Sequence, residues 1–452
     1  MNFTLANLKE QLFHPVSIYP LVALRLCFGA SMSLWALVMM VSGHVGQLYN
    51  DTTLHFPFKG LDWIRPLPYE FMLVVFSALS IAALFMAAGW FYRRSALLFI
   101  LLFSYIAFCD KAAYLSYYSF VILIAFMLVV SPAHRLFSLD LLRKPHIRVD
   151  YAPHWLLLAF KLQVVMLFFF AGMAKLNYDW LFTGLPITLW LQDVFVSFGW
   201  SADVLFSNPW IGISLSWFLV LFDFILPHFL MDTRTSQRAF WVVVLVQVPG
   251  MLIFPTGMFP LLVLLMCTVF LPHLPIHLLV SKISYFLYDF FQFKGEVFNP
   301  GGVFMLKYRM ERLFPAIAAL YFSIQVLLPV YLFLSWGSFH WANRAFHFSW
   351  DLHINQHRLP DIEFVKVNKL LGKSEPIEVD HLINSYQKKR MANDPEMLAT
   401  FIGALEHSAE ATSKGNIIEI QALRCYLSEK NIKQCSVLYR LERDGEKSVG
   451  KE

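Results

Sequence analysis

The sequence predicts a mainly α-helical protein: a polytopic bundle of about nine membrane spans, followed by a C-terminal α+β domain outside the membrane. Hydrophobic residues make up 58% of the 452 residues and charged residues only 15%, against roughly 45–50% and 25% in soluble domains. Apolar runs long enough to cross a bilayer recur as far as Leu334, and a soluble core has no room for so many of them. After Leu334 the composition becomes polar enough for a domain in water.

Each predicted span is a run of mostly apolar residues between charged or turn-forming ones, and a full crossing needs about 20 residues. The nine runs are Ile18–Val41, Phe71–Gly89, Ala96–Cys109, Tyr118–Ser131, Trp155–Ala174, Ile211–Met231, Phe240–Phe254, Met258–Leu271 and Leu313–Leu334. Several are short or contain proline, which neighbouring helices tolerate inside a membrane.

The loop charges predict the orientation. Lysine and arginine are concentrated in the even-numbered loops, for example at Arg93 and Arg94 and at Arg135 and Arg143. By the positive-inside rule these loops and the N-terminus face the cytoplasm. We therefore expect a cytoplasmic lead-in over residues 1–17, a transmembrane domain over 18–335, and an outward-facing soluble domain over 336–452. The net charge of +5 is spread over several loops and predicts no nucleic-acid partner.

The C-terminal domain has recognisable local signals. Asp394 followed by Pro395 predicts the N-cap and first residue of a helix. Two strands are predicted at Ile417–Leu427 and Ile432–Leu441, joined by a polar turn. A hairpin centred on the turn sets Cys425 opposite Cys435, and a disulfide there and two unpaired thiols are equally open interpretations.

Lys175 is the unusual residue of the apolar part, because it directly follows the run FFFAGMA. It is either an anchor that extends to the headgroups or a functional group, since ionisable residues at membrane depth are functional hypotheses by default. Asp179, four residues later, is a possible partner, although lysine before aspartate is the poorer order for a helical pair. Desolvation favours the neutral form of an amine, so a lysine at this depth is a candidate base.

Two further segments place polar or aromatic groups between apolar runs. The segment that begins Asp110-Lys111 and ends at Tyr114 is either a tight turn with an exposed ion pair or part of a site. The aromatic run from Phe339 to Asp351, which contains Trp341 and Trp350, is either an interfacial belt or a flat cleft for a planar ring such as a quinone.

These segments together resemble the vitamin K-dependent γ-glutamyl carboxylase family. The run AGMAKLNYDW is similar to the family's AG-x-x-KL-x-x-DW signature, and WANRAFHFSWDL is similar to its W-T-x-x-x-x-x-(F/Y)-S-W-x-M segment. The runs DKAAYLSYYSF, HRLFSLD and IFPTGMFP follow in matching positions, and QKKRMANDPEMLATFIGAL resembles the outer domain of bacterial members. The resemblance covers nearly the whole chain and identifies it as a bacterial-type homologue, a membrane protein with an HTTM domain.

The resemblance implies a reaction and a set of site residues. Lys175 is implied as the base that deprotonates reduced vitamin K, of the menaquinol or phylloquinol type. Oxidation of that quinol by O₂ to the epoxide then yields a base for the γ-proton of a glutamyl side chain, and CO₂ is added to the carbanion. No metal is required. Ser116 and Tyr117 are implied as catalytic. The implied substrate- or quinone-binding residues are Asp110, Lys111, Tyr114, Asn177, Asp179, Trp180, Phe254, Met258, Phe259, Trp341, Trp350 and Leu352.

The chain also departs from the family pattern. Ser116-Tyr117 stands where the family commonly has Asn-His, and Gln247 and Gly250 replace a histidine and an asparagine. Three functions therefore stay open: a carboxylase coupled to quinol epoxidation and acting on a secreted Glu-containing peptide, a quinol-oxidising relative without carboxylation, and a non-catalytic quinone- or lipid-binding membrane protein. The expected location is a bacterial inner membrane, with the C-terminal domain in the periplasm.

Overall fold

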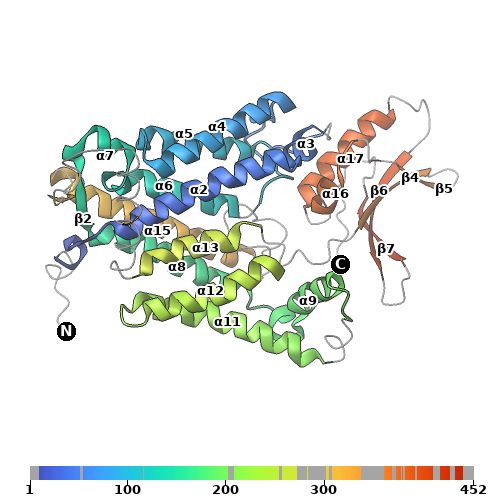
Figure 1. Cartoon of the computed structure of the whole chain (residues 1–452). Helices are drawn as coiled ribbons and strands as arrows, with labels where there is room; N and C mark the ends of the chain where they lie inside the picture. The colour runs from blue at the N-terminus through green and yellow to red at the C-terminus, as the bar shows by residue number, and fades with distance from the viewer. Residues whose placement is uncertain are drawn as a thin grey trace.

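The computed structural model is mainly helical and is described here for most of the chain (Figure 1). The residues it describes are 10–50, 54–115, 117–201, 208–253, 257–271, 282, 302–304, 308–336, 361–368, 373–377, 379, 382–391, 394–410, 418–427 and 433–440.

Four helices in these ranges are long and apolar enough to cross a membrane, namely α2 (Tyr19–Val41), α4 (Tyr69–Ala88), α8 (His154–Ala174) and α11 (Pro209–Met231). Each of the other five predicted runs also contains a helix. They are α5 (Tyr92–Phe108), α6 (Tyr117–Val130), α12 (Ser236–Ile253), α13 (Phe259–Cys267) and α15 (Tyr308–Trp336). The predicted runs are therefore found as helices, whereas the count of nine spans stays a prediction.

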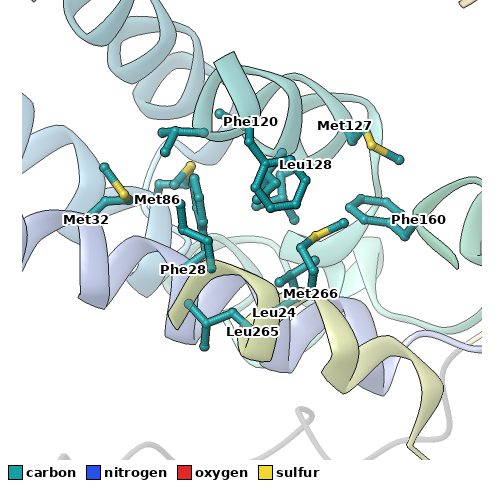
Figure 2. Close-up of a cluster of buried hydrophobic side chains, with 14 of the residues drawn as sticks. Leu24, Phe28, Met32, Met86, Phe120, Met127, Leu128, Phe160, Leu265 and Met266 are labelled. Atoms are coloured by element: carbon teal, nitrogen blue, oxygen red, sulfur yellow. The ribbon is translucent and has the colours of Figure 1, made fainter. Parts of the chain in front are cut away.

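The four long apolar helices carry apolar side chains on their inward and their outward faces, as a helix surrounded by lipid requires. Their inner faces form one large core, and Figure 2 shows part of it, where α2, α4, α6, α8 and α13 meet. Gly29 lets α2 approach α4 closely, because a Cβ there would lie 2.6 Å from the carbonyl oxygen of Ala83. The outward faces carry large exposed apolar side chains, such as Leu34 on α2 and Val74 on α4. Surfaces of this kind are covered by lipid or by protein.

A small sheet lies at the end of the helices that holds the N-terminus (Figure 1). Its strands are β1 (Pro15–Ser17), β2 (Val149–Pro153) and β3 (Gly302–Val303). β1 pairs antiparallel with β2, with Pro15 opposite Pro153, and β2 pairs parallel with β3. The predicted lead-in and the predicted fourth loop therefore lie together, on one side of the helices. Which side faces the cytoplasm stays a prediction.

The C-terminal part lies at the opposite end (Figure 1). It contains β4 (Asp361–Asn368), β5 (Lys373–Pro376), α16 (Ser385–Met391), α17 (Pro395–Glu410), β6 (Ile418–Leu427) and β7 (Lys433–Arg440). The strands form an antiparallel sheet in the order β5-β4-β6-β7. The two predicted strands are thus found to within one residue at each end. Cys425 lies opposite Cys435 in their register, and the disulfide itself stays a prediction.

Helix α17 begins as predicted from its sequence. Oδ1 of Asp394 accepts hydrogen bonds from the backbone N–H groups of Glu396 and Met397, each at 3.1 Å, which is the geometry of an N-cap. The helix buries an apolar face that consists of Met397, Leu398, Phe401, Ile402 and Leu405. Aromatic packing of Phe401 on Phe364, with ring centroids 4.9 Å apart, joins this face to the sheet.

A segment that the sequence did not predict folds back against α11. After α8, a π-helical turn, η3 (Asp179–Thr183), leads through Gly184 into α9 (Leu185–Ser197). Gly184 has φ +60°, and a Cβ on it would collide with the backbone of Gly212 in α11. A Cβ on Gly212 would in turn collide with Oγ1 of Thr188 and lie 2.9 Å from the Gly184 carbonyl oxygen. Only glycine fits on both sides of this contact.

We predict that Gly184→Ala destabilises the protein more than Gly199→Ala does. Both residues have positive φ, at +60° and +72°, but a Cβ on Gly199 meets nothing within 4 Å. The left-handed backbone costs each variant about 1–2 kcal/mol, and the collision with Gly212 adds about 1–3 kcal/mol to Gly184→Ala alone. Thermal unfolding in detergent compares the two, and equal melting temperatures would contradict the close contact.

Candidate active site

Lys175 lies where α8 ends, and its side chain turns back along that helix. The residue is the C-cap of α8, and its Nζ donates to the carbonyl oxygen of Ala171, one turn earlier, at 3.2 Å. Carbonyl groups in the last turn of a helix lack intrahelical partners, so an ammonium there is favoured. The Lys175 side chain is 13% exposed, which leaves it reachable from one side.

Asp223 of α11 is the partner of Lys175. Its Oδ2 lies 2.5 Å from Nζ, and the carboxylate side chain is only 9% exposed. Within α11, Asp223 stands fourteen residues after Pro209 and eight before Met231. At 1.5 Å per residue the carboxylate is therefore about 12 Å inside the nearer end of the helix. The ion pair thus lies at depth within a predicted span, where an uncompensated charge is costly.

The possible pairing of Lys175 with Asp179 is wrong. The α8 helix stops at Ala174 and the chain then enters the π-helical turn η3, so the i, i+4 geometry of an α-helix does not hold there. The Asp179 side chain is exposed. Its backbone carbonyl accepts a hydrogen bond from Oγ1 of Thr183 at 2.6 Å. Asp179 therefore begins the turn and is not the counter-charge.

Gly172 makes the approach of α8 to α11 possible. A Cβ on Gly172 would lie 3.3 Å from Cβ of Asp223 and 3.0 Å from the ring of Phe224. Such distances are tighter than ordinary van der Waals contact, so a side chain here would require the Phe224 ring or Asp223 to shift by a few tenths of an ångström. The small residue three positions before Lys175 thus brings the lysine within reach of its carboxylate.

Asn177 and Trp180 form the wall of the site beside Lys175. The Asn177 side chain accepts from the backbone N–H of Trp180 at 3.1 Å and donates to the Ala174 carbonyl at 3.1 Å, and so fixes the turn after α8. The Trp180 ring is fully buried, and its centroid is 5.6 Å from Nζ of Lys175. A cation over an indole face is a favourable contact.

Two buried polar atoms on this side of the bundle have no hydrogen-bond partner among the described residues: Nε1 of Trp180 and Oγ of Ser216. Ser216 lies on α11 seven residues before Asp223, which is two turns away on the same face. Buried donors of this kind are rare in native proteins unless a water or ligand satisfies them. Each of the two atoms is therefore available to a water or to a polar group of a ligand.

The segment from Asp110 to Tyr114 is not near Lys175 by any contact of the described residues, and joins the helices to the C-terminal part. Nζ of Lys111 pairs with Asp394 at 2.8 Å and Glu396 at 2.9 Å, both at the start of α17. The Tyr114 carbonyl accepts from the Arg390 guanidinium at 2.7 Å. The interpretation of an exposed ion pair is therefore wrong, since Lys111 is only 8% exposed and Asp110 1%.

Asp110 holds this junction from the membrane side. Its Oδ2 is 2.9 Å from Nδ1 of His55, and its Oδ1 accepts from the backbone N–H of Ala112 at 2.8 Å. Phe56 and Ala112 share one apolar core with α17 and the sheet, including Phe364 and Phe401. The C-terminal part is thus attached by a core as well as by ion pairs.

The remaining predicted residues are distributed over several places. Tyr117 is buried at the start of α6 and packs on Tyr118, with ring centroids 5.2 Å apart. Half-buried Met258 and Phe259 precede and begin α13, and Phe259 packs on Phe120. The predicted site residues that lie outside the described ranges are Ser116, Phe254, Trp341, Trp350 and Leu352. Their roles stay predictions.

Sequence reasoning missed Asp223, although a signal was present. The run WFLVLFDFILPHF places one carboxylate in an otherwise apolar span, and such a residue marks a functional site or a charge partner by default. In the described part of the chain no three His, Cys, Asp or Glu side chains come together in a way that could hold a metal ion.

Comparison with known families gives two matches. The family model described as the HTTM domain matches residues 13–273, more than half of the chain, and includes Lys175 and Asp223. The model described as the vitamin K-dependent gamma-carboxylase lumenal domain matches residues 310–435. No solved structure matches the chain.

We predict that Asp223→Asn destabilises the protein by about 3–5 kcal/mol, because it leaves the Lys175 ammonium in the span without a counter-charge. Asp179→Asn is the matched control, since it removes a carboxylate only four residues from the same lysine but from an exposed position. The control should stay within about 0.5 kcal/mol of wild type. Chemical unfolding in detergent measures both, and an equal loss in the two variants would argue against the Lys175–Asp223 pair.

We predict that Lys111→Ala loosens the C-terminal part from the membrane helices. The variant leaves Asp394 and Glu396 without their cation, and we expect hydrogen exchange across residues 382–405 to accelerate about tenfold. Exposed Lys59 provides the control, and Lys59→Ala should exchange like wild type. Unchanged exchange in Lys111→Ala would mean that the apolar core alone holds the junction.

Proposed function

This chain belongs to the vitamin K-dependent gamma-carboxylase family and contains its HTTM domain, and from that premise we propose that it uses Lys175 to couple oxidation of reduced vitamin K to carboxylation of peptidyl glutamate. The observation that carries the proposal is the ion pair of Lys175 with Asp223, at depth within an apolar helix bundle. Burying a charged pair in such a place costs desolvation free energy. Ionisable residues at membrane depth therefore mark functional sites by default.

Lys175 acts as the base in this proposal, and Asp223 positions it. As a neutral amine Lys175 can accept a proton from a bound hydroxyl. The carboxylate of Asp223, whose Oδ2 is 2.5 Å from Nζ, then stabilises the ammonium that forms. The hydrogen bond from Nζ to the Ala171 carbonyl keeps the amine aimed at the same place throughout.

The residues around Lys175 fit a hydroquinone. Such a ring has flat apolar faces and hydroxyl oxygens, and the site offers the buried Trp180 ring and the unsatisfied Trp180 N–H beside Nζ. When bound, reduced vitamin K supplies the reducing equivalents for O₂ and the strong base needed at the glutamyl γ-carbon. The indole N–H would be available to donate to an oxygen of such a ring, and apolar surroundings would limit the access of water.

The C-terminal part fits a role in holding a peptide. A pure quinone binder would have no need of an α+β domain over residues 336–452, and this one is attached to the transmembrane domain (18–335) through Lys111, Asp394 and Glu396. We propose that a secreted Glu-containing peptide binds there and reaches the site along the junction. On the positive-inside rule this side is the periplasm and the lead-in (1–17) is cytoplasmic, in a bacterial inner membrane.

Tyr117 is the reason to retain a second function, quinol oxidation without carboxylation. Tyr117 stands where the family commonly has a histidine, and it is a buried tyrosine packed on Tyr118. A phenol is a much weaker base than imidazole at neutral pH. A quinol-oxidising enzyme without carboxylation is therefore the alternative, whereas a purely quinone- or lipid-binding protein leaves the Lys175–Asp223 pair without a role.

The test supplies the purified protein in nanodiscs with reduced vitamin K, O₂, labelled bicarbonate and a Glu-rich peptide. We expect Lys175→Ala to lower epoxide formation and label incorporation about 10²–10⁴-fold, the usual contribution of a positioned base. Lys175→Arg should lose as much activity as Lys175→Ala, because arginine keeps a positive charge beside Asp223 but does not act as a base. Lys161→Ala, which removes another lysine from α8, should retain activity.

Each outcome separates the functions. Epoxide and label that both depend on Lys175 would support the carboxylase, and epoxide without label in wild type would support the quinol oxidase. If folded wild-type protein forms neither product, the non-catalytic quinone- or lipid-binding protein is the function that remains. Full activity in Lys175→Arg would contradict the role of Lys175 as a base, whatever the reaction.

A further inference from the structure

A cluster of basic side chains lies at the end of the helices that holds the N-terminus, far along the chain from Lys175. We define the basic cluster as Arg25, Arg93, His134 and Arg135. Arg25 comes from α2 and Arg93 from the first turn of α5, and the other two come from the 3₁₀ turn η1 (Ala133–Arg135). The same end of the bundle carries β2 and α7 (Leu139–Arg143) (Figure 1).

Arg25 forms the buried floor of the basic cluster. The residue is fully buried in α2. Its Nη1 donates to the Ala133 carbonyl at 2.9 Å, and its Nη2 donates to the Phe137 carbonyl. These bonds hold η1 against the helix, so that His134 and Arg135 are fixed in place. Its Nε has no partner among the described residues.

His134 and Arg135 also present polar atoms without partners. The His134 ring stacks on Tyr92 at a centroid distance of 4.9 Å, and the Arg135 guanidinium lies 4.7 Å from the Phe304 ring centroid. Nδ1 of His134 and Nε of Arg135 are buried and lack a hydrogen-bond partner in the described part of the chain. Three unsatisfied nitrogen atoms thus lie on three neighbouring basic residues, and buried groups of this kind are ordinarily satisfied by a water or an ion.

The positive charges of the basic cluster repel one another. Burial, followed by the charges of Arg93, Arg135 and Arg25, lowers the pKa of His134 to about 4. Burial and the charge of Arg93 lower the pKa of Arg135 as well. His134 is therefore neutral at physiological pH and still has one N–H to donate, whereas the three arginines stay charged.

The second and fourth predicted loops contain two acidic residues, Asp140 and Asp150. Asp150 pairs with Arg148, whose Nε is 3.3 Å from its Oδ1. Asp140 lies near the basic cluster and partly offsets the lowering of the His134 pKa. Its two oxygens accept from the backbone N–H groups of Phe91 and Tyr92, and so cap the start of α5. Its ion pair is with Arg143, at 4.0 Å. Asp140 thus leaves a net positive charge on the basic cluster.

We propose that the basic cluster is a binding site for a phosphate group, contributed by the headgroup of an anionic phospholipid. Arg93 is exposed and Arg135 half-buried, so both forks are accessible from outside, while His134 and Arg25 form the wall behind them. Arginine forks match the oxygens of a phosphate in pairs. Basic pockets between membrane helices at the interface are the usual sites for anionic headgroups.

The test measures lipid affinity by native mass spectrometry of the full chain in detergent, titrated with phosphatidylglycerol. Arg93→Gln and Arg135→Gln should each weaken binding about fivefold, the usual effect of one basic residue at an anionic lipid surface. Arg94→Gln is the matched control: it removes the neighbouring exposed arginine, which lies over Phe91 and outside the cluster. We expect its affinity to remain within about twofold of wild type.

A second arm adds inorganic phosphate to the same titration and to a thermal unfolding experiment. Phosphate that displaces the lipid and stabilises wild type, but not Arg93→Gln, would support the phosphate site and identify free phosphate as a second ligand. Equal loss of lipid affinity in Arg94→Gln, or unchanged affinity in Arg93→Gln and Arg135→Gln, would overturn the proposal. The exposed position of Arg93 means that its variant folds, and the unfolding curve checks this.

Discussion

The need to compensate a lysine inside an apolar bundle organises the centre of this structure. Nζ of Lys175 and Oδ2 of Asp223 are 2.5 Å apart. To bring them together, α8 must end at Ala174 and pack closely on α11. Gly172 allows that packing, Asn177 fixes the turn, and the Gly184–Gly212 contact folds α9 back against the same helix. Removing one partner of such a pair is far more destabilising than replacing both residues. The contacts that bring Lys175 and Asp223 together are therefore important for the stability of the bundle.

The sequence predicted the helices well and their contacts poorly. Runs of apolar residues mark spans because the bilayer sets their length, and all nine runs contain helices. Local signals also held, as in the Asp394 cap and the Cys425–Cys435 register. Asp223 was missed because it lies 48 residues from Lys175, and the choice of partner depends on which helices pack together. The π-helical turn η3 likewise has no local signal in Asp179–Thr183.

The same limit explains the segment from Asp110 to Tyr114. From sequence it was either a turn with an exposed pair or part of the site, because an aspartate next to a lysine suggests a local interaction. In the structure each charge has a different partner, His55 for Asp110 and the start of α17 for Lys111. Asp394 serves twice, since one oxygen caps α17 and the other pairs with Lys111. The position of the C-terminal part is therefore linked to the folding of its own helix.

The direction of the Lys175 side chain argues against a simple anchor. A lysine that anchors a span extends its amine toward the headgroups and water. Here the amine turns back to the carbonyl of Ala171, one turn deeper in α8, and meets Asp223 well inside α11. The contact with the buried Trp180 ring removes still more water from it. An anchor gains nothing from this arrangement, whereas a base needs an amine held in a fixed position, a carboxylate that stabilises its charged form, and surroundings that exclude water.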